Sequence, residues 1–317
     1  MRVTLDEIVE LVRTSPALAQ KAEIAMVREA FGAGDWLAGP GDDGAVVDTG
    51  AGRMVVCGEA IFPPFVAGDP YGAGIAAVLT NVNDVAAMGA EPVAIVDTIT
   101  GDDTTCRAVL DGLRYASDLY RVPVVGGHLT VTDGPPALSA FALGTCTVPL
   151  SAAAAAPGQC LGLLACLEGE MREDFPFFRS FEQRGDRLAD DVRLLAGLAA
   201  SGVCVAAKDV SMAGLLGSLA MLLEPSRCGV TIEVGDIPQP PGVELGPWLV
   251  AFPCFAFLVC LADGRDAEMR AVAAEHGLTY ADLGTLDDSG LLRVGDGGRT
   301  VTVSDVGADD ITGLRAR

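Results

Sequence analysis

Two adjacent carboxylates, Asp42 and Asp43, stand between glycines immediately before an apolar stretch that begins at Ala45. Oxygen ligands from a loop suit Mg2+, which binds a few carboxylates together with phosphate oxygens and water. The pair therefore predicts a magnesium site at the start of a strand. A plain hairpin turn is the alternative interpretation, because Asp-Gly is a common turn signal.

A second set of polar side chains lies on a predicted helix. Asn81 and Asp84 are three residues apart and therefore share a helix face. An amide and a carboxylate on one face would suit a metal ion or a ribose hydroxyl, and a solvated helix face is the alternative. Asp97, near the end of the next predicted strand, would either converge on the same site or cap a loop.

Paired glycines, Gly126 and Gly127, follow an apolar stretch and lead into His128 and Thr130. Such glycines let backbone N–H groups approach a phosphate closely, and backbone nests of this kind bind anions. His128 would serve as a general acid or base if its pKa lies near neutrality, and a hydrogen-bonded loop histidine is the alternative. The other histidine, His276, precedes a glycine and is interpreted as a helix C-cap.

Lysine-dependent chemistry has only two candidates, because Lys21 and Lys208 are the only lysines of the chain. Lys208 and Asp209 precede a predicted apolar helix for which Ser211 is the expected N-cap. A helix N-terminus favours bound anions, so Asp209 would supply a ligand there from the second half of the chain. Simple helix capping is the alternative.

Composition limits the class of protein. The chain has 317 residues, half of them hydrophobic, which is enough for two domains that each have a core. Its 43 acidic and 21 basic residues give a formal net charge of -22, which repels nucleic-acid backbones and anionic lipid surfaces. We therefore expect no nucleic-acid partner, and any phosphate must be held by local contacts.

Cysteine usage and apolar stretches favour a cytoplasmic protein. The nine cysteines include no Cys-x-x-Cys pair, and five lie in apolar stretches where they fit as small hydrophobic residues: Cys57, Cys160, Cys166, Cys254 and Cys260. Residues 1–13 form a capped amphipathic pattern without a signal-peptide core. The apolar stretch 248–262 is shorter than the roughly 20 residues that cross a bilayer, so no membrane segment is expected.

Hydrophobic periodicity and turn signals predict the elements that must position these residues. In the first half we expect helices 4–13 and 20–31, strands 45–48 and 53–60, a long helix from Pro70 toward Gly89, strand 92–99, helix 103–120, and strands 121–125 and 137–146. In the second half we expect strand 160–167, helices 187–200 and 212–224, strands 229–234 and 252–261, and helix 264–276. The low-complexity segment 149–159 marks the boundary between domains 1–150 and 151–317.

Four of these stretches, taken in order, resemble the signatures of one superfamily. They are GDDGAVV (41–47), NVNDVAAMGAEPVA (81–94), VPVVGGHLT (122–130) and KDVSMAGLLGSL (208–219). They are similar to the signature segments of the AIR synthase-related superfamily, which includes AIR synthase, thiamine-monophosphate kinase, selenophosphate synthetase, the hydrogenase-maturation dehydratase and the formylglycinamidine synthase core. The resemblance extends from about residue 20 to the end of the chain.

The resemblance implies a two-domain α+β fold, in which the N-terminal domains of a homodimer form a β-barrel and the C-terminal domain is an α/β sandwich. It also implies that ATP and Mg2+ bind between the domains. The metal ligands that it implies are Asp42, Asp43, Glu59 and Asp84, with Glu59 standing where several relatives have aspartate. The nucleotide-binding residues that it implies are Asn81, Asp84, Gly126, Gly127, Thr130, Lys208 and Asp209, and the catalytic candidates are His128, Lys21 and Asp97.

Differences between this sequence and the named enzymes reduce the number of superfamily branches that it resembles. The chain lacks the C-terminal cysteine of the hydrogenase-maturation protein, and His128 stands where thiamine-monophosphate kinase has aspartate. The stretches AAKDVSMAGLLGSLAMLLE and PWLVAFPCFAFLV are most similar to the AIR synthase-related family of bacterial nitrilase gene clusters. Enzymes encoded nearby are therefore candidate partners.

The superfamily uses ATP to phosphorylate an oxygen of an amide or acid, and in some members a nitrogen then displaces the phosphate. The resemblance thus implies a magnesium-dependent ligase or phosphotransferase acting on a small molecule, with carboxylates holding Mg2+ on the triphosphate. Two alternatives stay open. One is a small-molecule kinase, and the other is a scaffold or sensor that binds the nucleotide without catalysis.

Overall fold

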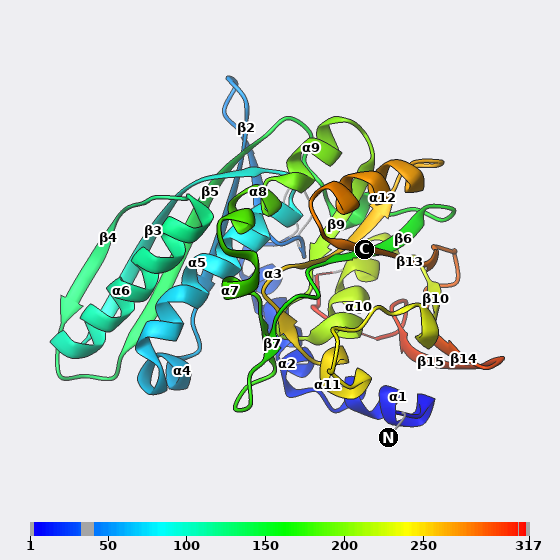
Figure 1. Cartoon of the computed structure of the whole chain (residues 1–317), viewed down its shortest axis with the longest axis horizontal. Coiled ribbons are helices and arrows are strands. Elements are labelled where there is room, and N and C mark those ends of the chain that lie inside the picture. The colour runs from blue at the N-terminus through cyan, green and yellow to red at the C-terminus, as the bar shows by residue number, and fades with distance from the viewer. Residues whose placement is uncertain (1–2, 33–40, 310, 315–317) are drawn as a thin grey trace. The chain divides into compact units, whose positions relative to one another are not determined.

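The computed structural model describes residues 3–32, 41–309 and 311–314, which fold into two compact units (Figure 1). The smaller unit comprises Asp43–Pro149 and Gly185–Ala200. The larger unit comprises Met1–Asp42, Leu150–Arg184 and Ser201–Arg317. Helices and strands occur in both units, which confirms the predicted α+β class. Among the described residues, no helix is both long and apolar enough to cross a membrane.

The smaller unit is built on a five-stranded sheet in the order β1-β2-β5-β3-β4. Its strands are β1 (Ala45–Asp48), β2 (Arg53–Ala60), β3 (Glu91–Gly101), β4 (Val124–Val131) and β5 (Ala137–Cys146). Only β3 and β4 pair in parallel, and the other neighbours are antiparallel. Its helices are α4 (Pro63–Gly68), α5 (Pro70–Ala87), α6 (Asp103–Tyr120), α8 (Leu188–Asp191) and α9 (Leu194–Ala200), with the 3-10 turn η3 (Gly185–Arg187).

Helices α5 and α6 lie side by side over one face of this sheet (Figure 1). Helix α5 begins where the sequence predicted, since the Asp69 side chain accepts a hydrogen bond from the Gly72 N–H at 2.8 Å. It ends at Ala87, and Gly89 follows with a φ of 68°. Both predicted ends of the long helix are therefore confirmed.

The two faces of the sheet differ in burial. Alternate side chains of β2, β3 and β5, such as Val55, Ile95 and Ala142, are buried on the face that the helices cover. The opposite face carries exposed apolar side chains, among them Val47 and Phe141. We call this second face, with its exposed apolar side chains, the open face.

Three sheets form the framework of the larger unit. Four antiparallel strands in the order β13-β6-β12-β9 are Thr279–Thr285, Cys160–Ala165, Ala256–Leu261 and Cys204–Asp209. A second sheet contains β10 (Val230–Glu233), β14 (Leu291–Asp296) and β15 (Arg299–Asp305), and a third contains β7 (Glu170–Met171), β8 (Phe177–Arg179) and β11 (Phe252–Pro253).

Helices and 3-10 turns complete this unit. They are α1 (Leu5–Arg13), α2 (Pro16–Ala19), η1 (Gln20–Ile24), α3 (Ala25–Phe31), η2 (Ala152–Ala154), α7 (Phe181–Arg184), α10 (Gly214–Ser226), η4 (Val234–Asp236), α11 (Leu245–Leu249) and α12 (Asp266–Glu275). Helix α10 is buried from Gly214 to Glu224 and packs within the hydrophobic core. His276 is the C-cap residue of α12, as predicted.

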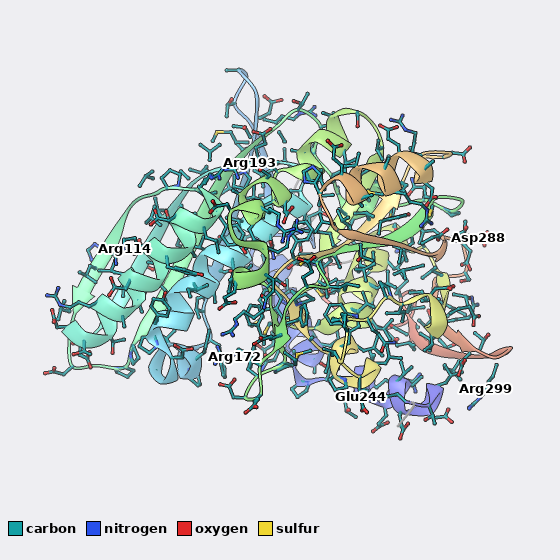
Figure 2. All side chains as sticks on the ribbon, in the orientation of Figure 1. Arg114, Arg172, Arg193, Glu244, Asp288 and Arg299 are labelled. Carbon is teal, nitrogen blue, oxygen red and sulfur yellow. The ribbon has the colours of Figure 1, made fainter. Side chains whose placement is uncertain are left out.

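Side chains at the surface tie several of these elements together (Figure 2). Arg299 of β15 pairs with Asp6 of α1 at 2.8 Å, which joins the first helix to the last strand of the larger unit. In the smaller unit, Arg193 donates to the carbonyls of Tyr120 and Arg121 at 3.1 Å, which satisfies acceptors at the end of α6. All nine cysteines are free, and most are buried as the sequence indicated.

Several predicted elements require correction. The predicted helix 20–31 is a 3-10 turn followed by α3, and the predicted helix 187–200 is divided into η3, α8 and α9. The strand expected at 121–125 begins at Val124 and continues to Val131, because Arg121 adopts a φ of 51° and still belongs to the turn after α6. Strands β7 and β8 and helix α11 were not predicted, since they are short, and β9, which ends in Lys208 and Asp209, was not predicted either.

Candidate functional site

In the smaller unit, Asp43 and Asp84 meet at one place. Asp43 lies in the turn before β1, and Asp84 lies on the buried side of α5 with 7% of its surface exposed. Ligand oxygens of these two carboxylates are within 4.8 Å of each other. One Mg2+ with bonds of about 2.1 Å would need only a small adjustment to bind both. Two of the four predicted metal ligands are therefore brought together.

The thiol of Cys57 shows that a third carboxylate belongs to this neighbourhood. Burial raises the pKa of Cys57 well above its ordinary value, and the negative charges of Asp84, Glu59 and Asp43 raise it further. These carboxylates therefore lie within electrostatic range of a single sulfur atom. A metal role for Glu59 stays a prediction.

Asn81 is oriented toward the interior of the smaller unit. Its side chain is fully buried, and its amide Nδ2 donates to the carbonyl of Ala77 at 2.8 Å. The Cys57 thiol donates to Asn81 Oδ1 at 3.4 Å and to Asn81 O at 3.5 Å. The amide thus connects α5 to β2 beside Asp84. Direct contact of Asn81 with a nucleotide stays a prediction, and Cys57 is a neighbour of the site that the sequence showed only as an apolar residue.

A cross-strand row on the helix-covered face contains two of the predicted site residues. Glu59 of β2 pairs with Ala140 of β5, Ala140 pairs with Asp97 of β3, and Asp97 pairs with Gly127 of β4. Directly paired residues share a face of the sheet, so Glu59 and Asp97 lie on the same side with Ala140 between them. Burial raises the pKa of Asp97, whose side chain is 7% exposed.

The close approach of Asp97 leaves room only for a glycine at position 127. A Cβ placed on Gly127 would lie 2.4 Å from the Asp97 carbonyl oxygen and 2.9 Å from its carboxylate carbon. A Cβ placed on Gly126 would have no heavy atom within 4 Å. Both glycines belong to β4, and neither has a positive φ. The predicted backbone nest at Gly126 and Gly127 is therefore wrong, because parallel pairing with β3 keeps this segment extended.

His128 and Thr130 lie on the other side of the sheet. His128 pairs with Thr98, which in turn pairs with Ser139, and Thr130 pairs with Thr100. Because successive side chains alternate between faces, His128 and Thr130 project from the open face, opposite to Asp97. Both are exposed on the edge strand β4. The structure thus separates the predicted acid or base His128 from the carboxylates under the helices.

In the larger unit, the carboxylate of Asp42 holds the start of η2. Asp42 Oδ2 accepts a hydrogen bond from the Ser151 hydroxyl at 2.7 Å, and its Oδ1 accepts one from the Ala152 N–H at 2.7 Å. These bonds give Asp42 a structural role that the adjacent Asp-Asp pair did not indicate. A metal role for Asp42 stays a prediction.

Lys208 and Asp209 end strand β9 as a buried pair. Each is only 4% exposed, and Lys208 Nζ lies 3.4 Å from Asp209 Oδ1. The expected cap at Ser211 is wrong, because α10 begins at Gly214 and the Ser211 N–H donates to the Ser218 hydroxyl at 3.0 Å. Lys21, the other lysine, is half-buried in η1.

Another group of ligand-type side chains, Cys160, Asp266 and Asp282, lies in the larger unit with ligand atoms within 4.8 Å of one another. The Cys160 sulfur is 3.5 Å from the Tyr280 hydroxyl, and Arg270 pairs with Asp266 at 2.8 Å. Burial and hydrogen bonding to Cys160 raise the pKa of Tyr280. These side chains form hydrogen bonds and ion pairs with one another. We therefore interpret the cluster as part of the packing of α12 on β13.

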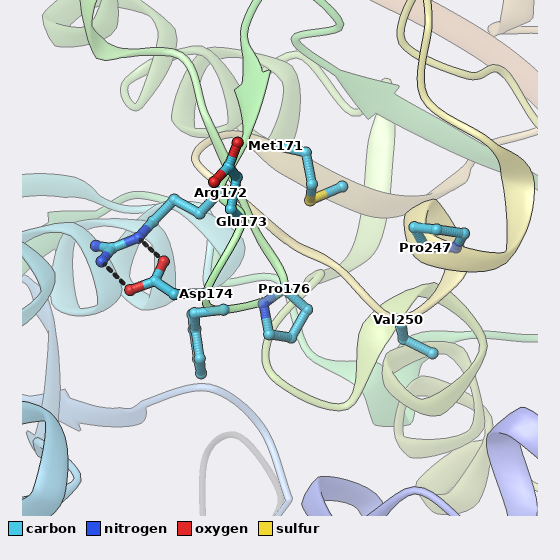
Figure 3. A pocket seen from close by; sticks show the side chains of 8 residues that line it. Met171, Arg172, Glu173, Asp174, Pro176, Pro247 and Val250 are labelled. Carbon is cyan, nitrogen blue, oxygen red and sulfur yellow. Dashed lines mark hydrogen bonds and ion pairs between the residues drawn. The ribbon is translucent and has the colours of Figure 1, made fainter.

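A pocket of about 280 Å³ is formed by the β7–β8 hairpin and α11 (Figure 3). Met171, Pro176, Pro247 and Val250 give it an apolar lining, and the ion pair of Arg172 and Asp174 at 2.8 Å lies at its side. None of the predicted site residues lines it.

Comparison with known proteins relates both halves of the chain to one family. Residues 41–146 match the model of the AIR synthase related protein, N-terminal domain, and residues 159–297 match that of its C-terminal domain. The uncharacterized protein sll0787 of Synechocystis sp. is 30% identical over 277 residues, which are 86% of each chain.

Larger proteins share the same fold. Phosphoribosylformylglycinamidine synthase subunit PurL of Acidiphilium cryptum is 28% identical over 291 residues, covering 83% of this chain and 40% of that subunit. The structure of T. maritima PurL complexed with ADP matches with a TM-score of 0.75 and 18% identity, covering 95% of this chain and 54% of that one. The two family models together span most of the sequence, and the protein therefore belongs to the AIR synthase related family.

Proposed function

We propose that the protein binds ATP with Mg2+ and transfers a phosphoryl group to an oxygen of a small-molecule amide or acid. The observation that carries the proposal is the meeting of Asp43 and Asp84 within 4.8 Å, with Glu59 in the same electrostatic neighbourhood. The sequence relative PurL and the T. maritima PurL structure with bound ADP support a nucleotide as the ligand.

In this proposal Asp43, Asp84 and Glu59 would hold Mg2+. The bound ion would neutralise negative charge on the phosphoryl group that is transferred. The carboxylates position the ion and need not accept protons. Asp97 stands in the same cross-strand row as Glu59, where a carboxyl group with a raised pKa is suited to proton transfer. The nucleotide-binding roles of Thr130, Lys208 and Asp209 and the catalytic roles of His128 and Lys21 stay predictions from the family resemblance.

The test compares two isosteric variants, Asp84→Asn and Asp43→Asn, with Asp111→Asn as a matched control. Asp111 is an exposed carboxylate of α6 in the same unit and pairs with surface Arg114 at 3.0 Å. Each protein is incubated with ATP, Mg2+ and a panel of small amides and acids, and free phosphate and products are measured. Loss of one metal-binding carboxylate should lower the rate at least 100-fold, about 2.7 kcal/mol of transition-state stabilisation.

The products distinguish the proposal from its alternatives. A ligase or dehydratase releases free phosphate, whereas a kinase accumulates a phosphorylated small molecule that mass spectrometry detects. Tight MgATP binding with no turnover under any condition would instead identify a nucleotide-binding scaffold. Equal binding and turnover in Asp84→Asn and Asp111→Asn would overturn the assignment of the site.

A further inference from the structure

The carboxylate of Glu224, near the end of α10, is buried and holds the C-terminal segment of the larger unit. Its side chain is 2% exposed. The Ile311 N–H donates to Oε1 at 3.0 Å, and the Thr312 N–H and hydroxyl donate to Oε2 at 3.1 and 2.6 Å. Consecutive backbone N–H groups that converge on an anion form a strong, charge-assisted contact. We call Glu224 with residues 311–314 the C-terminal clasp.

The clasp lies against the N-terminal segment of the same unit. Gly313 has a φ of 69°, and a Cβ placed on it would lie 2.4 Å from the Ala25 Cβ. Only a glycine therefore allows this close approach of the C-terminal segment to the start of α3. Ala25 directly follows η1, the 3-10 turn that contains Lys21.

The segment that carries Lys21 lies at the surface of the larger unit. Helices α2 and α3 and the turn η1 contain no buried residue. Leu18 is half-buried against the core, and a Cβ on Gly217 of α10 would lie 3.5 Å from its Cδ1. Gly217 and Glu224 are seven residues apart on α10 and so lie on one helix face. The N-terminal segment is thus held between α10 and the clasp.

The same end of α10 borders the loop that carries the first carboxylate motif. A Cβ on Gly41, whose φ is 102°, would lie 3.8 Å from Pro225 Cγ. Gly41 precedes Asp42, whose carboxylate holds the start of η2. The clasp therefore lies next to two segments of the larger unit that carry predicted phosphate- or metal-binding residues.

We propose that Glu224 is a positioning residue, which through the C-terminal clasp fixes the segment that carries Lys21, a residue that the family resemblance assigns to the chemistry of MgATP. The last part of this statement rests on the proposed function. Release of the clasp leaves the folded core intact, because the core of α10 is formed by its leucines and not by Glu224. It lowers the fraction of molecules whose Lys21 segment is in place.

The test uses the full chain with Glu224→Gln, Thr312→Val and the conservative variant Thr312→Ser. Glu275→Gln, at an exposed position of α12, is the matched control for the loss of one carboxylate. Hydrogen exchange is followed in residues 16–31 and 311–314, and MgATP affinity is measured by calorimetry. If about one molecule in ten keeps the segment in place, the apparent Kd for MgATP rises about tenfold in Glu224→Gln and Thr312→Val.

Faster exchange in both segments for these two variants, with wild-type exchange in Thr312→Ser and Glu275→Gln, supports the proposal. Faster exchange in residues 311–314 alone overturns it, because the clasp then stabilises the C-terminal segment without stabilising residues 16–31. A wild-type protein that does not bind MgATP, but whose residues 16–31 still respond to Thr312→Val, would overturn the proposed function while supporting the clasp. If Glu224→Gln does not fold, Thr312→Val alone decides.

Discussion

Burial of single side chains decides which of the candidate residues can act on a ligand. Asn81, predicted to face a nucleotide, has both ends of its amide bonded to Ala77 and Cys57. Asp42 is similarly engaged by Ser151 and Ala152. Ligand oxygens of Asp43 and Asp84 lie within 4.8 Å of each other. Residue types alone could not separate these cases, because an amide or carboxylate has the same ligand chemistry wherever it points.

The raised pKa of Asp97 predicts how the stability of the fold depends on pH. Burial raises its pKa in the folded protein, so the folded state binds more protons than the unfolded state in the window above about 3.9, the ordinary Asp value. The stability from this group is present at low pH and is lost as pH rises through the raised pKa. We therefore expect Asp97→Asn to be at least as stable as wild type at pH 7, with the difference vanishing below about pH 4.

Urea unfolding of both proteins between pH 4 and pH 8 measures this difference. Asp111→Asn, which changes an exposed carboxylate, should show none of it. A loss of stability in Asp97→Asn that grows as pH rises would show that the ionised carboxylate is stabilised by its surroundings instead. If Asp97 also transfers a proton in the proposed reaction, Asp97→Asn loses turnover without losing stability.

At the scale of elements, strand alternation and register assign the residues of one motif to two faces. Gly127 and His128 are adjacent, yet Gly127 shares a face with Asp97 and His128 shares one with Thr98. The β3–β4 pairing also explains why the segment is a strand and not the expected phosphate-binding turn. Its chemistry therefore depends on which neighbouring strand it joins.

The contact of Gly127 with β3 predicts the effect of one added methyl group. Gly127→Ala places a Cβ 2.4 Å from the Asp97 carbonyl oxygen. This oxygen belongs to the backbone of β3, which can shift only at a substantial energetic cost. We expect a loss of about 1–3 kcal/mol in the free energy of unfolding. Gly126→Ala is the matched control, since its Cβ meets nothing within 4 Å and should change stability by less than about 0.5 kcal/mol or raise it.

Thermal and urea unfolding of the two variants check this prediction. Equal stabilities would show that β4 shifts freely relative to β3, and that position 127 does not require a glycine beside Asp97. Added salt or Mg2+ should not restore Gly127→Ala, because the conflict is steric.

At the scale of the whole molecule, the open face of the smaller unit is the feature that needs a partner. It exposes Phe141 at 44% and Val47 at 47%, next to the polar row of His128, Thr98 and Ser139. Contiguous exposed apolar groups of this kind mark interaction surfaces. We propose that a second copy covers this face, as the family resemblance implied, and that the two sheets together form the barrel.

The proposed dimer can be tested by mass in solution. The chain has a mass of 32.5 kDa, and the wild type should sediment with twice that value. Phe141→Glu should shift the protein toward the monomer, because it buries a charge in the interface. Leu110→Glu, on an equally exposed apolar residue of α6 at 42%, should leave the dimer unchanged. A monomeric wild type, or equal effects of the two variants, would contradict the proposal.

The sequence by itself predicted several elements of the smaller unit closely. Strands 45–48, 53–60 and 137–146 and helix 103–120 agree with β1, β2, β5 and α6 in their bounds. Local signals suffice there, because alternating apolar residues, the cap at Asp102 and turn residues at each end all indicate the same structure. The ordered motifs likewise identified the family and the α+β fold.

Only the tertiary structure decided how the candidate residues are grouped. It brought Asp43, Asp84 and Glu59 into one neighbourhood, put His128 on the opposite face from Asp97, and engaged Asp42 with η2. It also revealed the clasp at Glu224, where residues 87 positions apart meet. The physical reason is that strand pairing and helix packing join distant parts of the chain, and no local pattern of residues records which strand or helix will be the neighbour.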